Sequence, residues 1–180
     1  MPRVQSFPPI ADAKARILIL GSMPGNASLA AGQYYAHAQN LFWHILAEVS
    51  GTDAAAPYAA RARALKSCGI ALWDVLASCT REGSLDSAID EDSIRANNFA
   101  SFYRLHPGIA QVFFNGAKAE ASYRRHVLPG LAPGAGPQIY RRLPSTSPAN
   151  ASMARAYKKK VWKQALRLAI GGHGPWSGAG

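Results

Sequence analysis

ARILILGSMPG, residues 15–25, is a continuous apolar run that ends in a tight turn. Consecutive aliphatic residues without polar alternation are typical of a strand buried on both faces. Gly21 and Gly25 permit a sharp turn after this strand, and Pro24 stiffens it. The turn lacks both the lysine of a P-loop and the glycine spacing of a dinucleotide-binding loop. We therefore expect a central strand that carries a functional turn at its carboxyl end, and this turn is not a nucleotide phosphate loop.

The rest of the chain repeats this alternation of short apolar runs and helical patterns. Further strands are predicted at 70–76, 109–116 and 138–144, and helices at 41–49, 57–69, 93–105, 117–128 and 148–170. Ser147 is the predicted N-cap of the last helix, with Pro148 at its first position. The predicted buried stripe of that helix consists of Ala154, Tyr157, Val161, Ala165 and Leu168.

Strands bracketed by helices imply a mainly parallel sheet that is covered on both faces, which is a three-layer α/β/α sandwich. A length of 180 residues suits one domain. Its core is expected over about residues 15–170, and residues 171–180 are expected to form a flexible tail.

Charge is distributed unevenly along the chain. Twenty Lys and Arg residues against ten Asp and Glu residues give a net charge of +10. Residues 141–170 contain eight cations and no acid, whereas residues 82–92 contain five of the ten acids. The basic segment favours a polyanionic partner, although solubilising basic faces are also common. The acidic segment, which includes Ser84 and Asp86, is expected to be a solvated loop that repels DNA from the wrong face.

Membrane and metal functions find no support in the composition. No apolar run reaches the roughly 20 residues that span a bilayer, and the N-terminus lacks the apolar stretch of a signal peptide. The two cysteines, Cys68 and Cys79, have no histidines at the spacing of a zinc site. We expect a cytoplasmic, nucleoid-associated monomer without a membrane segment, a metal cluster or another cofactor.

Polar side chains follow the predicted strands where ligands bind in α/β folds. The carboxyl ends of parallel strands meet at one edge of the sheet, so the segments that begin at Gly21, Asp74, Asn115 and Leu143 should converge there. The first of these continues into QYYAHAQNLFW (residues 33–43), which combines a flat aromatic face with neutral amides. Its last amide, Asn40, is equally suited to cap the helix that follows.

Two motifs carry a resemblance to a known family. GSMPG followed by QYYAHAQNLFW, with LPSTSPAN (residues 143–150) a hundred residues later, resembles the uracil-DNA glycosylase superfamily. Within it, the sequence is most similar to the hypoxanthine-DNA glycosylase (DNA-deoxyinosine glycosylase) family, over essentially residues 15–170. The resemblance implies a metal-free enzyme that flips a deaminated base, in the first place hypoxanthine, out of DNA and hydrolyses its N-glycosidic bond. A uracil or thymine mismatch glycosylase and a catalytically inactive DNA- or RNA-binding module of the same fold are the alternatives.

The resemblance also implies roles for residues of the first motif. Tyr35 falls where mismatch glycosylases place the aromatic that stacks on the flipped base. Met23 stands where those enzymes have their water-positioning asparagine, so the catalytic amide must come from elsewhere. Asn40 is the first candidate, because it matches the asparagine that the hypoxanthine family uses for catalysis. Met23 and Pro24 would then form the floor of the base pocket.

Three further residues are expected to face the base. Asp74 stands at the position of the base-reading asparagine of the efficient uracil glycosylases. Its carboxylate can accept a hydrogen bond from a ring N–H, and burial would raise its pKa. Asn115 is a candidate donor to the O6 atom of hypoxanthine, and His37 is expected to hold the loop or a phosphate. Roles in local capping or turns are the alternatives for Asp74 and Asn115.

The second motif is expected to contact DNA. In the superfamily the corresponding loop pinches the DNA backbone, and hydroxyls and amides at a helix N-terminus bind phosphate well. The predicted DNA contacts are Arg142, Ser145, Thr146, Ser147 and Asn150. Neither motif contains a lysine, so Schiff-base lyase activity is not expected.

Overall fold

A computed structural model describes residues 1–171 of the chain. Apart from Gly171, the predicted flexible tail lies outside the described residues. The strands are β1 (Arg3–Gln5), β2 (Ile17–Gly21), β3 (Ile70–Asp74), β4 (Leu76–Arg81), β5 (Ile89–Ala96), β6 (Gln111–Asn115) and β7 (Ile139–Leu143). The helices are α1 (Asn26–Ala31), α2 (Phe42–Ser50), α3 (Tyr58–Ser67), α4 (Phe99–Leu105), α5 (Ala117–His126) and α6 (Arg155–Gly171), with short 3₁₀ turns at Asp86–Ala88 and Leu128–Gly130.

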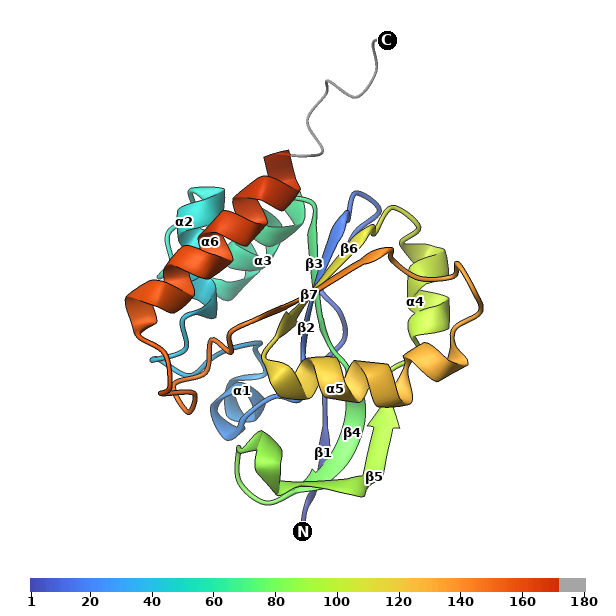
Figure 1. Cartoon of the computed structure of the whole chain (residues 1–180). Coiled ribbons are helices and arrows are strands. Elements are labelled where there is room, and N and C mark those ends of the chain that lie inside the picture. The colour runs from blue at the N-terminus through green and yellow to red at the C-terminus, as the bar shows by residue number, and fades with distance from the viewer. Residues whose placement is uncertain (172–180) are drawn as a thin grey trace.

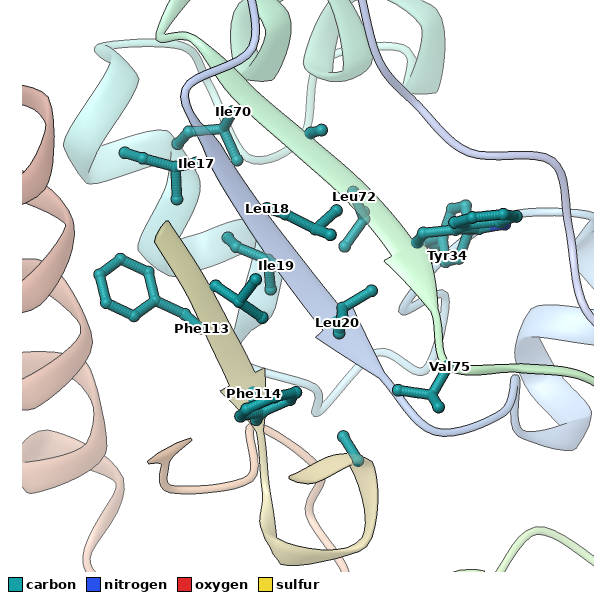
Figure 2. Close-up of a cluster of buried hydrophobic side chains, with 14 of the residues drawn as sticks. Ile17, Leu18, Ile19, Leu20, Tyr34, Ile70, Leu72, Val75, Phe113 and Phe114 are labelled. Carbon is teal, nitrogen blue, oxygen red and sulfur yellow. The ribbon is translucent and has the colours of Figure 1, made fainter. Parts of the chain in front are cut away.

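The central sheet has four parallel strands in the order β3-β2-β6-β7. Strand β2 lies in the middle of the sheet, and the side chains from Ile17 to Leu20 are all fully buried. Figure 2 shows them between the aliphatic side chains of β3 and the phenylalanines of β6. The prediction from the aliphatic run is confirmed, because its side chains are buried on both faces of a covered sheet.

Helices cover the two faces of this sheet and complete the predicted three layers. Figure 1 shows α2, α3 and α6 together on one side, and α4 and α5 on the other. On the first side Phe42 of α2 packs edge-on against Trp162 of α6, with ring centroids 6.5 Å apart. On the second side Phe114 of β6 meets Tyr123 of α5 at 5.2 Å. The α/β/α sandwich is confirmed.

A second, antiparallel sheet in the order β1-β4-β5 extends from the end of β3 and was not predicted. The helix predicted over 93–105 is wrong in its first part, because residues 93–96 belong to strand β5, which pairs with β4. The helix that does form, α4, begins at Phe99, and the Asn98 side chain caps it by accepting a hydrogen bond from the Ser101 N–H (3.0 Å). The true cap signal was therefore Asn98 rather than Ser93.

The last helix begins later than predicted, at Arg155 instead of Pro148. Residues 148–153 form turns, and the Ser147 hydroxyl accepts only from the Ala149 N–H, two residues on (3.2 Å). The buried stripe is also displaced from the prediction. Trp162 anchors it, and its members are Lys158, Trp162, Ala165, Leu166 and Ala169, whereas Tyr157 and Leu168 are exposed.

Two observations on the described residues concern membrane helices and metal ligands. No helix among residues 1–171 combines the length and the apolar character that spanning a membrane requires. Within the same residues, His, Cys, Asp and Glu side chains form no group of three or more that could hold a metal ion. Both cysteines are free thiols, with Cys79 buried and Cys68 half-buried.

Candidate active site

A cavity of about 900 Å³ opens at the carboxyl edge of the parallel sheet. The register sets Gly21 beside Asp74 and Asn115 beside Leu143, so the ends of neighbouring strands lie level. The predicted convergence of these four segments is confirmed. All the predicted catalytic, base-binding and DNA-binding residues line this cavity: Met23, Pro24, Tyr35, His37, Asn40, Asp74, Asn115, Arg142, Ser145, Thr146, Ser147 and Asn150.

The turn after β2 approaches two side chains so closely that only glycine fits at its first position. A Cβ atom on Gly21 would lie 2.6 Å from Asp74 Oδ1 and 2.8 Å from the Tyr35 hydroxyl oxygen. Both distances are well inside van der Waals contact. Met23, two residues on, is nearly buried at 8 % exposure and presents only a thioether to the cavity. The turn thus contributes shape to the cavity rather than a polar group at position 23.

Asp74 is the most buried of the Asp, Lys and Arg side chains that line the cavity. The carboxyl is 3 % exposed, and its Oδ2 atom accepts a hydrogen bond from the Ser6 hydroxyl (2.7 Å). Burial raises the pKa of Asp74 to about 7, and the negative charge of Asp86 adds to the rise. The hydrogen bond from Ser6 and the positive charge of Arg81 oppose it. At neutral pH the carboxyl therefore exists in both states, one that accepts and one that donates a hydrogen bond.

This shift makes stability depend on pH in a defined direction. The folded pKa of Asp74 lies above the unfolded value of 3.8, so the folded state binds more protons between that value and about pH 7. The stabilisation is complete below the unfolded pKa and is lost as pH rises through about 7. We expect Asp74→Asn to gain stability relative to wild type as pH increases over this window. Urea unfolding at several pH values measures this, with Asp92→Asn as the matched removal of an exposed carboxylate; a stability difference that is constant with pH would contradict it.

Tyr35 adopts a backbone conformation that is unusual for a tyrosine. Its φ is +54°, in the left-handed region, and its ring stacks on Phe42 with centroids 4.2 Å apart and an interplanar angle of 29°. The hydroxyl is buried and has no hydrogen-bond partner among residues 1–171. Burial is also the main cause that raises the pKa of this hydroxyl, followed by the charge of Asp74. Phe42 thus supports one face of the ring at the cavity wall.

The Asn40 side chain satisfies the first N–H of α2, as a helix cap does, although Leu41 occupies the N-cap position itself. Its Oδ1 atom accepts from the Phe42 N–H (2.9 Å), and its own N–H donates to the His37 carbonyl (2.9 Å). The exposed His37 ring also works locally, because its Nδ1 atom accepts from the Gln39 N–H (3.1 Å). These bonds fix the Asn40 side chain at the cavity and leave its NH₂ group without a bond to the rest of residues 1–171.

Asn115 and Thr146 form a reciprocal pair that joins the two motifs. Asn115 Nδ2 donates to the Thr146 hydroxyl (2.9 Å), and Asn115 Oδ1 accepts from the Thr146 N–H (2.9 Å). The Thr146 carbonyl in turn accepts from the Leu41 N–H (3.1 Å), next to Asn40. Thr146 is 1 % exposed. Thr146 therefore connects the two motifs inside the protein. Asn115 uses only one of its two side-chain N–H groups in this pair.

The rest of the second motif lies at the rim of the cavity. Two side chains of α6 bind the backbone of this loop. Lys158, which is 3 % exposed, donates to the carbonyls of Ser147 and Asn150. The Trp162 indole N–H donates to the Pro144 carbonyl (2.7 Å). Burial lowers the pKa of Lys158. Because α6 begins only at Arg155, the helix dipole expected at Ser147 is not available there.

The acidic segment was assigned the wrong place. It is not a loop remote from the site: Ser84, Leu85, Asp86 and Ser87 line the cavity. The Ser22 hydroxyl donates to Asp86 Oδ1 (2.6 Å), across 64 residues of sequence. The sequence around Asp86 does not distinguish it from the other acids of residues 82–92, because its partner Ser22 lies 64 residues away in the chain. Met153, which the sequence analysis also missed, contributes an exposed apolar side chain to the lining of the cavity.

Comparison with known proteins agrees with this geometry. A family model described as the uracil DNA glycosylase superfamily matches residues 8–167. A hypoxanthine DNA glycosylase of Methanosarcina barkeri is 41 % identical over 116 residues, which cover 64 % of this chain and 72 % of that protein. A hypoxanthine DNA glycosylase of Methanosarcina acetivorans is 36 % identical over 116 residues, which again cover 64 % of this chain and 72 % of that protein.

A solved structure extends the likeness to nearly the whole chain. The solution NMR structure of a Methanosarcina acetivorans protein, described provisionally as a uracil DNA glycosylase, superposes with a TM-score of 0.76 at 32 % identity. The match covers 93 % of this chain and 99 % of that one. The motifs, the fold and the cavity at the carboxyl edge of the sheet thus lead to one conclusion: the chain belongs to the uracil DNA glycosylase superfamily and is a DNA glycosylase.

Proposed function

We propose that this glycosylase releases hypoxanthine from deoxyinosine in DNA, by flipping the nucleotide into the cavity and hydrolysing its N-glycosidic bond without a metal. The observation that carries the proposal is Asp74, a buried carboxyl at the cavity floor with one oxygen held by Ser6. Its pKa of about 7 makes both hydrogen-bonding states accessible at neutral pH. The names of the two Methanosarcina relatives support the same base.

Recognition of the base would use a face and an edge. The Tyr35 ring has one face on Phe42, so a flipped base would stack on the other. Ionised Asp74 would accept from N1–H of hypoxanthine, and protonated Asp74 would donate to O6. The second N–H of Asn115, which Thr146 does not use and which lies near the Tyr35 hydroxyl, is a further donor for O6. Met23 and Pro24 would supply the apolar floor of the pocket.

Hydrolysis would proceed through a cationic sugar. When the bond between C1′ and the base breaks, the base leaves as an anion, and hydrogen bonds to it strengthen only in the transition state. Water that attacks a cationic sugar needs positioning more than deprotonation, and a neutral amide can provide that. Asn40 is the proposed group because its NH₂ is unbonded to other residues within 1–171 and its cap bond holds it at the cavity.

DNA would lie across the rim formed by the second motif. Exposed Arg142 and the hydroxyls and amides of Ser145, Ser147 and Asn150 face this rim and suit phosphate oxygens. Thr146, being buried, would hold the loop in place through Asn115. Exposed Met153 beside them could fill space left by the flipped base. The protein is proposed to act as a monomer.

The decisive experiment compares release of single bases from defined duplexes that contain inosine, uracil, xanthine or a thymine mismatch. We expect the highest single-turnover rate with inosine, and binding that weakens steeply as salt increases. A matched duplex without a lesion is the control. Strong uracil release with none from inosine would overturn the proposed base. Binding that is insensitive to salt would overturn the proposed contacts between the rim and the DNA phosphates.

A further inference from the structure

The segment between β4 and β5, residues 82–88, contributes residues 84–87 to a wall of the cavity, and the mechanism above gives this wall no role. In Figure 1 this green loop lies beside α1, and two hydrogen bonds confirm that it meets the turn after β2. The Ser22 hydroxyl donates to Asp86 Oδ1 (2.6 Å), and the Asn26 N–H donates to the Ser84 hydroxyl (2.8 Å). The segment is thus attached to the turn that bears Met23.

A buried arginine supports the same wall. The Arg81 side chain is fully buried and donates to the carbonyls of Pro24 (2.5 Å) and Gly83 (2.9 Å). A guanidinium stays charged at all working pH values, and a buried cation requires nearby negative charge. The charge of Arg81 lowers the pKa of both Asp74 and Asp86, so one buried cation acts on two carboxyl groups of the cavity.

The two carboxyl groups differ in their access to water. Asp74 is buried at the floor, whereas Asp86 is exposed at the open wall. The protein around Asp86 raises the pKa of its carboxyl, and Ser22, Arg81 and Lys118 oppose the rise. The side of Asp86 that does not contact Ser22 is open to solvent, so a molecule that enters the cavity can reach its carboxyl. Two carboxyls in one site with different environments suit two different roles.

We propose that Asp86 is a further catalytic residue, whose carboxylate faces the deoxyribose of the flipped nucleotide and accepts a proton from the attacking water. This inference rests on the proposed hydrolysis of a flipped nucleotide. Asp74 at the floor meets the base, which enters deepest, so the sugar and the water meet the wall nearer the mouth. The negative charge of Asp86 would also stabilise the positive charge that develops on the sugar.

The proposed step balances in atoms and charge. As the bond from C1′ to the base breaks, the base leaves with both bonding electrons and C1′ becomes cationic. The water oxygen forms a new bond to C1′, and one water proton passes to the carboxylate of Asp86. The products are the C1′ hydroxyl, neutral Asp86 and the base anion, which recovers a proton from Asp86 or from solvent. Asn40 orients the same water, and Asp86 receives its proton.

Three variants separate charge from attachment. Asp86→Asn keeps an oxygen that accepts from Ser22 but removes the charge. Ser22→Ala removes the hydrogen bond but keeps the charge. Glu82→Gln removes an exposed charge from the same segment without touching the cavity. Each is compared with wild type in single-turnover release of whichever base the wild type releases fastest, and in affinity for the same duplex. Thermal unfolding checks that each variant is folded.

We expect Asp86→Asn to slow release about 100-fold or more with unchanged DNA affinity, the usual effect of losing a proton acceptor, and the other two variants to stay within about fivefold of wild type. The wild-type rate should rise with pH as Asp86 ionises beside Arg81, Lys118 and Asp74, and Asp86→Asn should lose this dependence. A rate for Asp86→Asn within about threefold of wild type would overturn the inference. Base release by Ser22→Ala that is as slow as that by Asp86→Asn would also overturn the inference, because it would mean that Asp86 only attaches the segment to the turn after β2.

Two further outcomes remain decidable. If Asp86→Asn unfolds early, Asp86→Ala with added formate tests the same point: recovery of the rate supports a proton acceptor, and no recovery overturns it. If the wild type releases uracil but not hypoxanthine, the proposed base is wrong, and the comparison of variants on uracil still decides the role of Asp86.

Discussion

Replacing Asn40 by alanine is expected to slow base release about 100- to 1000-fold, the usual cost of removing one preorganised polar group from an active site. The side chain lines the cavity, and its Oδ1 atom is fixed by the Phe42 N–H at 2.9 Å. DNA affinity should change little, because the residue acts on water in the transition state rather than on phosphates. Single-turnover rates and duplex affinity, measured together, test both expectations.

The helix cap requires its own control in this experiment. Asn40→Ala also removes the cap of α2, which costs about 1 kcal/mol of stability. Asn40→Asp retains an oxygen that can accept from Phe42 and loses only the NH₂ group. We expect Asn40→Asp to be as stable as wild type and nevertheless slow. Release by Asn40→Ala within about threefold of wild type would refute the catalytic role and leave only the cap.

The parallel sheet could be predicted because its signal is local. The run from Ile17 to Leu20 has no polar alternation, and that pattern alone requires cover on both faces. The second sheet could not be predicted in this way. Strand β5 is held by pairing with β4, and its sequence IDEDSIRA alternates weakly. Where pairing rather than side-chain pattern decides the conformation, local propensity misleads, as it did at Ser93.

The cavity residues were predictable for a related reason. Strand ends converge on one edge, so residues just after β2, β3, β6 and β7 must meet there whatever their partners. Their hydrogen-bond partners were not predictable. Asn115 is bound to Thr146, 31 residues away, and Asp86 to Ser22, 64 residues away. A contact between distant segments depends on the fold as a whole, so Asp86 was assigned to a loop remote from the site.

Replacing Gly21 by alanine is expected to abolish most activity and to destabilise the protein by about 1–3 kcal/mol, the usual cost of overpacking a buried site. The backbone at Gly21 is not in the left-handed region, so alanine is not strained there. The effect would come only from the added methyl, which meets Asp74 Oδ1 at 2.6 Å and the Tyr35 hydroxyl at 2.8 Å. Either both side chains move within the proposed base pocket, or the turn after β2 moves.

Gly25→Ala is the matched control, because it lies in the same turn and its new Cβ would meet Ser84 at an ordinary 3.5 Å. The cause can also be isolated by a second substitution. Tyr35→Phe removes the hydroxyl oxygen and leaves the ring carbon beneath it at 3.7 Å from the new methyl. The pair Gly21→Ala with Tyr35→Phe should therefore recover part of the stability lost by Gly21→Ala alone. Urea unfolding of the four proteins measures the coupling; strictly additive effects would mean that the turn gives way and that the base pocket does not depend on this close approach.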